Sequence, residues 1–107
     1  CGGDRDKGKR QMMGKIASER ADSIILTNDN PRSEDPQAII DDILAGTKVE
    51  NDVQIILDRG DAIRSAIQSL GEEEVLLITG KGHETTQVIG SKSHPFSDIE
   101  VALDALK

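Results

Sequence analysis

The sequence of 107 residues predicts an α/β fold of the Rossmann-like, doubly wound type, with a mostly parallel sheet and a C-terminal hairpin. Three short apolar runs, at residues 23–27, 53–57 and 75–79, have the length and continuous apolar character of parallel strands that are covered on both faces. Stretches with the apolar spacing of helices separate these runs. Because right-handed crossovers connect strands that alternate with helices, we expect helices on both faces of the sheet.

Residues 9–21 are expected to form the first helix, directly after a glycine-rich turn. This helix is weakly amphipathic. The side chains on its apolar side are Met12, Met13, Ile16 and Ala17. Since the chain opens with loop residues, we expect the first strand of the sheet to lie upstream of Cys1 in a longer chain.

The next two helices are expected between the apolar runs. Pro36 suits the first position of a helix, with Asp35 as the residue that caps it. The apolar residues with helical spacing are Ile39, Ile40, Ile43 and Leu44, and then Ala62, Ile63, Ala66, Ile67 and Leu70.

The pattern changes after the third apolar run. Residues 85–93 are expected to form a hairpin that turns at Gly90 and Ser91. Residues 97–106 are expected to form a closing amphipathic helix, which Ser97 caps. The sequence contains no internal repeat or flexible linker, which indicates a single domain.

The composition restricts both the core and the partners. Phe96 is the only aromatic residue, so aliphatic side chains must fill the core. The formal net charge of −7 argues against nucleic acid and anionic membranes as partners, since both are bound mainly by clustered Lys and Arg. No apolar run reaches the roughly 20 residues of a membrane span, and the single cysteine, Cys1, fits a reducing compartment. We therefore expect a cytoplasmic protein.

Three polar loops follow the predicted strands, at residues 2–10, 29–36 and 80–84. In a doubly wound sheet, ligands bind in the crevice outside the carboxyl ends of the strands. The loops are therefore expected to converge on one site. The histidines and the cysteine have no metal-ligand spacing, and the sequence contains no nucleophile motif of a hydrolase. We therefore assign no catalytic residue and no metal ligand.

The first loop suits an anion. Its glycines permit a tight turn, and N–H groups at the start of a helix favour negative charge. Arg5, Lys7 and Lys9 add positive charge. Taken alone, the same pattern also fits a turn followed by a solvated, basic helix start.

The second loop suits a carboxylate, because Arg32 offers a planar fork of donors and Asn30 lies beside it. The alternative is that the loop merely ends a strand, with Arg32 in a surface ion pair. In the third loop, Glu84 and the carbonyl group of Gly80 can bind an ammonium group, whereas a histidine such as His83 more often orients a neighbouring loop than transfers a proton. The residues thus indicate a site for a small zwitterion with an additional carboxylate.

The order and spacing of these motifs resemble the C-terminal domain of the Mur ligase family over essentially the whole chain. The general motifs are Gly-Asp-Arg-Asp-Lys-Gly-Lys-Arg at residues 3–10 and Gly-Lys-Gly-His-Glu at residues 80–84. Asp-Asn-Pro-Arg at residues 29–32 resembles the form found in members that add meso-diaminopimelate. Gln11 stands where the family usually has a proline at the start of this helix. It is not one of the residues expected to contact a ligand. The resemblance implies that residues 1–107 are one domain of a three-domain enzyme.

The resemblance also implies the roles of individual residues. Those that would bind meso-diaminopimelate are Arg5, Asp29, Asn30, Pro31, Arg32, Gly80 and Glu84. Arg32 would hold the distal carboxylate, which lysine lacks, and leaving a buried arginine unpaired costs about 3–5 kcal/mol. Asp4 and Lys7 would face ATP.

The family reaction uses ATP to join the amino acid to UDP-N-acetylmuramoyl-L-alanyl-D-glutamate in peptidoglycan synthesis. The resemblance implies that ATP and Mg²⁺ are bound mainly by domains outside this sequence, which has no G-x-x-x-x-G-K-[ST] loop, and that this domain closes over ATP. The isolated domain is therefore expected to be inactive. Two alternatives stay open: a related ATP-dependent amide ligase of the lysine-adding or folylpolyglutamate type, and a non-catalytic module that binds a small molecule.

Overall fold

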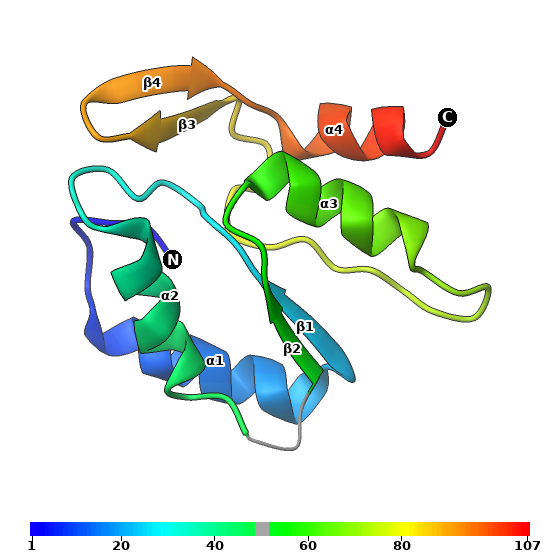
Figure 1. The fold of residues 1–107 in the computed structure, drawn as a ribbon, viewed down its shortest axis with the longest axis horizontal. Coiled ribbons are helices and arrows are strands. Elements are labelled where there is room, and N and C mark those ends of the chain that lie inside the picture. Colours follow the sequence, from blue (N-terminus) through cyan, green and yellow to red (C-terminus); the bar gives the residue numbers. More distant parts are fainter. Residues whose placement is uncertain (49–51) are drawn as a thin grey trace.

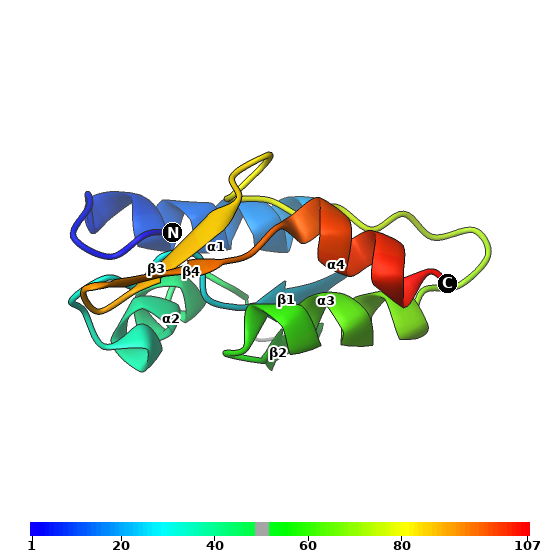
Figure 2. The same cartoon turned by 90° about the horizontal axis from the view of Figure 1, so that it is seen from above.

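The computed structural model describes residues 1–48 and 52–107, and the molecule is thin in one direction, with principal extents of 39, 33 and 18 Å (Figure 2). Its helices and strands are, in order, α1 (Gly8–Arg20), β1 (Ser23–Leu26), α2 (Pro36–Leu44), β2 (Asp52–Ile55), α3 (Arg59–Gln68), β3 (Thr86–Ile89), β4 (Lys92–Pro95) and α4 (Asp98–Ala105). The parallel strands β1 and β2 lie between the α1–α2 pair and the α3–α4 pair (Figure 1). The predicted α/β class is confirmed.

The main core forms between β1 and α2. Alternate residues of a strand point to the same face, and Ile24 and Leu26 of β1 are both buried. The residues that pack against them from α2 are Ile39, Ile40 and Ile43. Burial of an aliphatic side chain of this size contributes about 1.5–3 kcal/mol, so this contact holds α2 on the sheet.

The start of α2 is the one that the sequence predicts. The carboxylate of Asp35 accepts a hydrogen bond of 3.1 Å from the N–H of Gln37, and Pro36 is the first helical residue. A cap of this kind satisfies one of the free N–H groups at the helix start. The end of β1 and the start of α2 thereby fix both ends of the second loop.

The buried side of α1 is only partly the predicted apolar side, of which Ala17 packs against the core. The exposed apolar side chains, between 44% and 61% accessible, are Met12, Met13 and Ile16. The buried residues, four apart along the helix, are Arg10, Gly14 and Ser18. A Cβ at Gly14 would overlap the carbonyl group of Ile43 in α2. The close backbone approach at Gly14 and the polar bonds of Arg10 therefore decide which side of α1 is covered, and the apolar pattern does not.

Residues 75–79 do not form the third parallel strand that the sequence predicts. Within the described part of the chain, their backbone groups pair with no strand, and Val75 and Leu77 are 92% and 81% exposed. The carbonyl group of Thr79 instead accepts a hydrogen bond from Arg59. A strand requires a neighbour for its hydrogen-bond ladder, and these residues lack one here.

The C-terminal part forms as predicted. β3 and β4 pair in antiparallel fashion, and the turn falls at Gly90, whose φ of 62° is a conformation that glycine adopts readily. Ser97 caps α4 by accepting a hydrogen bond from the N–H of Glu100. Among the described helices, none combines the length and the apolar character that a membrane crossing requires.

Candidate functional site

The first and second loops are joined directly. The N–H of Gly3 donates to the carbonyl oxygen of Asn30 at 2.7 Å, and Nη1 of Arg32 donates to the carbonyl oxygen of Gly3 at 2.8 Å. A Cβ at Gly3 would overlap the carbonyl group of Pro31, so only glycine permits this approach. Pro31 itself is fully buried and shapes the loop from the inside.

Two residues of these loops adopt a left-handed backbone conformation. Asp4 has a φ of 56° and Arg32 a φ of 52°, and this conformation costs a residue other than glycine about 1–2 kcal/mol. The carboxylate of Asp4 accepts a hydrogen bond of 2.7 Å from the hydroxyl group of Ser33. Contacts between the loops therefore hold both backbone conformations, and backbone strain of this kind clusters at functional sites.

A buried arginine, Arg10, connects the first and second loops to α2 by hydrogen bonds. Arg10 is 1% exposed and bonds to Glu34 at 2.7 Å, to Asp42 at 2.9 Å and to the carbonyl oxygen of Gly2 at 3.2 Å. The hydrogen bond from Arg10, followed by one from the backbone N–H of Asp4, lowers the pKa of Glu34 to about 2. The carboxylate is thus held in its charged form.

The second and third loops meet at Lys81. Its side chain is fully buried, and Nζ donates to Oδ1 of Asn30 at 2.7 Å and to the carbonyl oxygen of Thr86 at 2.9 Å. Two carboxylates lie close to Nζ: Oδ1 of Asp29 at 3.4 Å and Oε1 of Glu84 at 3.6 Å. This lysine therefore connects two predicted site loops to β3.

The hairpin also fixes the second loop. The N–H of Arg32 donates to the carbonyl oxygen of Val88 at 3.1 Å, and the N–H of Gly90 donates to the carbonyl oxygen of Arg32 at 2.6 Å. Nε2 of Gln87 donates to the carbonyl oxygen of Asp29 at 2.8 Å. The second loop is therefore held from both sides, by the first loop and by the hairpin.

The ends of β1 and of residues 75–79 are linked by Arg59. Its guanidinium group, which is buried, donates to the carbonyl oxygens of Asn28 and Thr79, each at 3.0 Å, and pairs with Asp98 of α4 at 2.7 Å. Gly80 follows directly, with a φ of 110°, and a Cβ there would lie 3.2 Å from Oδ2 of Asp29. The third loop is thus placed against the second.

The structure brings most of the predicted site residues together. The guanidinium group of Arg32 and the Cγ of Arg5 both lie against Gly2, and Nη1 of Arg5 donates to the carbonyl oxygen of Asp4 at 3.3 Å. Asp29, Asn30, Gly80 and Glu84 gather around Lys81, as described above. Lys7, within the first loop, is exposed and lies 3.6 Å from Glu34. We call residues 2–5, 28–34 and 80–90 the loop cluster.

The supporting residues were not assigned a role from the sequence. Arg10 and Lys81 lie inside the predicted motifs, but a motif does not tell which of its cations is buried. Arg59 and Gln87 lie outside the predicted loops. The sequence places Arg59 just after a predicted strand and Gln87 inside the predicted hairpin, and it gives no other indication of their roles. Their partners are 20 to 59 residues away along the chain.

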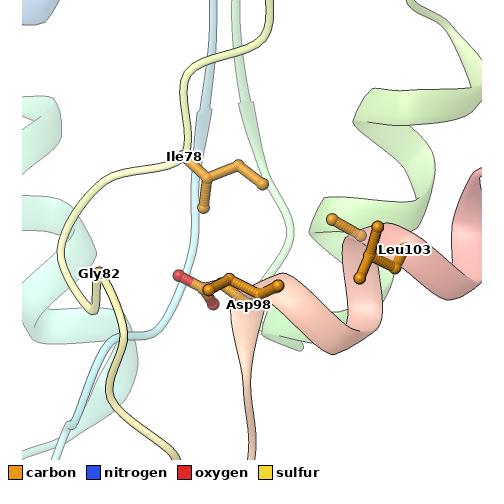
Figure 3. Close-up of a pocket in the computed structure, with 6 residues that line it drawn as sticks. Ile78, Gly82, Asp98 and Leu103 are labelled. Carbon is orange, nitrogen blue, oxygen red and sulfur yellow. The ribbon is translucent and has the colours of Figure 1, made fainter.

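A shallow apolar groove lies beside the loop cluster. It is lined by Ile78, Gly82, Asp98, Ile99, Ala102 and Leu103, and Figure 3 shows Ile78 and Leu103 on opposite sides of it. Its apolar walls are poorly suited to a charged amino acid, and the carboxylate of Asp98 is already paired with Arg59. The loop cluster, which contains Arg5 and Arg32 together with the carboxylates of Asp29 and Glu84, has the chemistry that a zwitterion with an extra carboxylate requires.

Comparisons with known proteins show the family of the chain. A family model described as "Mur ligase, glutamate ligase domain" matches residues 1–82. The chain is 56% identical over 106 residues to the UDP-N-acetylmuramoyl-L-alanyl-D-glutamate--2,6-diaminopimelate ligase of Coxiella burnetii. It is 54% identical over 107 residues to the ligase of the same name from Haemophilus influenzae. These alignments cover 99% and 100% of this chain and 22% of each relative.

A solved structure of a ligase with this name is also similar. The similarity covers 99% of this chain and 22% of that one, with a TM-score of 0.94 and a sequence identity of 39%. The chain therefore spans about a fifth of the length of these relatives.

Proposed function

The chain belongs to the Mur ligase family, and from this premise we propose that it is the C-terminal, acceptor-binding domain of an ATP-dependent ligase. The ligase would add meso-diaminopimelate to UDP-N-acetylmuramoyl-L-alanyl-D-glutamate in peptidoglycan synthesis. The names of the similar proteins support this substrate. A reaction that consumes ATP and a nucleotide-linked substrate also favours the cytoplasm as its location.

The geometry of Arg32 is the observation that carries this proposal. Its backbone is held in the left-handed conformation, and Nη1 is bonded to the carbonyl oxygen of Gly3, so its remaining N–H groups are available to a ligand. A planar guanidinium group fits a carboxylate with two parallel hydrogen bonds. In this site Arg32 would hold the distal carboxylate of meso-diaminopimelate, a group that lysine lacks.

The remaining residues of the loop cluster complete the acceptor site. Arg5, whose Nη1 donates to the carbonyl oxygen of Asp4 at 3.3 Å, would supply a second cation for a carboxylate. Glu84, whose side chain is 53% exposed, and the carbonyl group of Gly80 would hold ammonium groups. Asp29 and Asn30 would shape the end of the site around Arg32, with Pro31 as their buried support.

The contribution of this chain to ATP binding would be limited to the first loop. Lys7 is exposed directly before α1, where a cation suits a phosphate, although the N–H of Gly8 already donates to Asp6 at 2.9 Å. Asp4, held by Ser33, would lie beside it. Mg²⁺ would be bound together with ATP by the other domains of the enzyme. ATP would activate the glutamate γ-carboxylate for attack by the acceptor amine, and the isolated chain would be inactive.

Residues 1–107 would be one domain of a longer, three-domain enzyme, and a strand upstream of Cys1 would complete its sheet. β1 is paired only with β2 in the described structure, Leu77 is exposed, and Arg59 bridges the end of β1 and Thr79. A strand inserted between β1 and residues 75–79 would supply ladder partners to both.

An acceptor assay on the full-length protein that contains this chain tests the proposed function. With ATP and UDP-N-acetylmuramoyl-L-alanyl-D-glutamate, we expect phosphate release and product formation that depend on meso-diaminopimelate, and much weaker activity with L-lysine. Equal use of lysine would favour a lysine-adding ligase, and use of a folate would favour the folylpolyglutamate type. Binding of the amino acid without any turnover would favour a non-catalytic module.

A further inference from the structure

A fully buried lysine with no assigned role lies at the centre of the loop cluster. Two of the three N–H donors of Lys81 go to Oδ1 of Asn30 and to the carbonyl oxygen of Thr86, at 2.7 and 2.9 Å. Nζ also lies 3.4 Å from Oδ1 of Asp29 and 3.6 Å from Oε1 of Glu84. Since its nitrogen is surrounded by acceptors and closed to solvent, Lys81 is not placed to act as a nucleophile or to touch a substrate.

We propose that Lys81 is a positioning residue that orients the Asn30 amide, so that the NH₂ group of Asn30 faces the acceptor site and donates to a carboxylate of the substrate. This inference rests on the proposed function for the identity of the acceptor. It adds a residue that determines how the site recognises that acceptor.

The hydrogen bonds of Asn30 determine the orientation of its amide. Oδ1 accepts two of them, from Nζ of Lys81 at 2.7 Å and from the N–H of Val88 at 2.9 Å. Both donors require an oxygen at that position, so the amide cannot be reversed without losing both bonds. Nδ2 donates to no acceptor among the described residues, and it is not among the buried side-chain atoms that lack a partner. The amide therefore presents a donor outward, and a carboxylate accepts such donors.

The positive charge of Lys81 also favours the binding of a substrate carboxylate. Asp29 and Glu84 place two carboxylates beside a site that must accept the carboxylates of the substrate. The ammonium group between them offsets this negative charge at 3.4 and 3.6 Å, and the offset is strong because the nitrogen is removed from water. Oδ1 of Asp29 is buried and has no hydrogen-bond partner, so Lys81 is the nearest compensation for this atom.

The experiment uses the full-length ligase with two substitutions, Lys81→Met and Asn30→Asp. Lys81→Met preserves the length of the side chain and removes its charge and donors. Asn30→Asp preserves the oxygen that accepts from Lys81 and Val88, and it replaces the outward donor by a second oxygen. The matched control is Lys92→Met, because Lys92 is exposed on β4 and its side chain forms no hydrogen bond or ion pair among the described residues.

Each substitution is expected to raise the KM for meso-diaminopimelate by about tenfold or more, the effect of losing one charge-assisted contact. The KM for ATP and the kcat are expected to stay within about twofold, and Lys92→Met to leave all three constants unchanged. An unchanged KM for meso-diaminopimelate in folded Lys81→Met would overturn the proposal. If Lys81→Met does not fold, as judged by circular dichroism, Asn30→Asp decides the matter: an unchanged KM there means that the amide does not donate to the substrate.

Failure of the proposed function is visible separately in the unsubstituted enzyme. If that enzyme uses a different acceptor, the proposed function is wrong. The same substitutions, measured with the acceptor that it does use, still test the role of Lys81: a raised KM supports it and an unchanged KM contradicts it.

Discussion

The loop cluster and the unpaired segment of residues 75–79, which we call the sheet edge although it has no ladder partner here, are organised in opposite ways. In the loop cluster, polar groups that are far apart in sequence satisfy one another, as in the bonds of Asn30 to Gly3, Lys81 and Val88. At the sheet edge, apolar side chains stay in water: Val75 is 92% and Leu77 81% exposed. The comparison indicates that polar bonds between distant residues hold the loop cluster in place, whereas residues 75–79 have no ladder partner among the described residues.

The largest expected effect is at Arg59, which joins the two regions. Arg59→Met would leave Asp98 buried without its partner, and it would remove the hydrogen bonds to Asn28 and Thr79. Breaking a buried ion pair on one side costs about 3–5 kcal/mol, so denaturant unfolding of the chain should show a loss of this size. The control is Arg64→Met, which removes a half-exposed pair with Asp61 and should cost less than about 1 kcal/mol. Equal losses in the two variants would mean that Arg59 does not connect the regions.

A smaller effect is expected at Glu34, and it depends on pH. The pKa of Glu34 is lowered to about 2 in the folded chain, from an ordinary value of 4.5. Between these two values the unfolded chain binds the additional proton, so the stabilising contribution of Glu34 is complete above pH 4.5 and is lost as the pH falls toward 2. Thermal unfolding should therefore show a smaller loss of Tm between pH 5 and pH 2.5 in Glu34→Gln than in the unsubstituted chain. The same acid sensitivity in both proteins would contradict the assigned role of the pair between Glu34 and Arg10.

The smallest effect is expected at the sheet edge. Because Leu77 is 81% exposed, Leu77→Ser should change the free energy of unfolding of the 107-residue chain by less than about 0.5 kcal/mol. In the full-length protein, where an added strand would bury this edge, the same substitution should cost about 1.5–3 kcal/mol. Hydrogen exchange of residues 75–79 in both proteins gives an independent measurement. A large loss of unfolding free energy in the 107-residue chain would show that residues 75–79 are already packed. It would contradict the contrast between the loop cluster and the sheet edge.

Local signals in the sequence were sufficient for much of the fold. Pro36 and Ser97 marked the starts of α2 and α4, and Gly90 marked the turn of the hairpin, because caps and turns depend on residues that are close along the chain. The rule that ligands bind at the carboxyl ends of parallel strands was sufficient to predict that the three loops meet.

The rest depended on contacts between distant residues. The covered side of α1 follows from Gly14 and Arg10 meeting α2, and neither contact can be inferred from apolar spacing. Residues 75–79 have the composition of a strand, but a ladder forms only with a neighbour. The burial of Lys81 could not be predicted either, because its partner Asn30 lies 51 residues away.

The central claim is that the loop cluster selects an acceptor by its distal carboxylate through Arg32. The most direct measurement is the ratio of kcat/KM for meso-diaminopimelate to kcat/KM for L-lysine in the full-length enzyme and in Arg32→Ala, with Arg20→Ala as an exposed control at the end of α1. We predict a ratio of at least about 100 in the unsubstituted enzyme and in the control, and a fall to within about tenfold of unity in Arg32→Ala, with the KM for ATP unchanged. A ratio that survives the loss of Arg32 would show that the distal carboxylate is bound elsewhere.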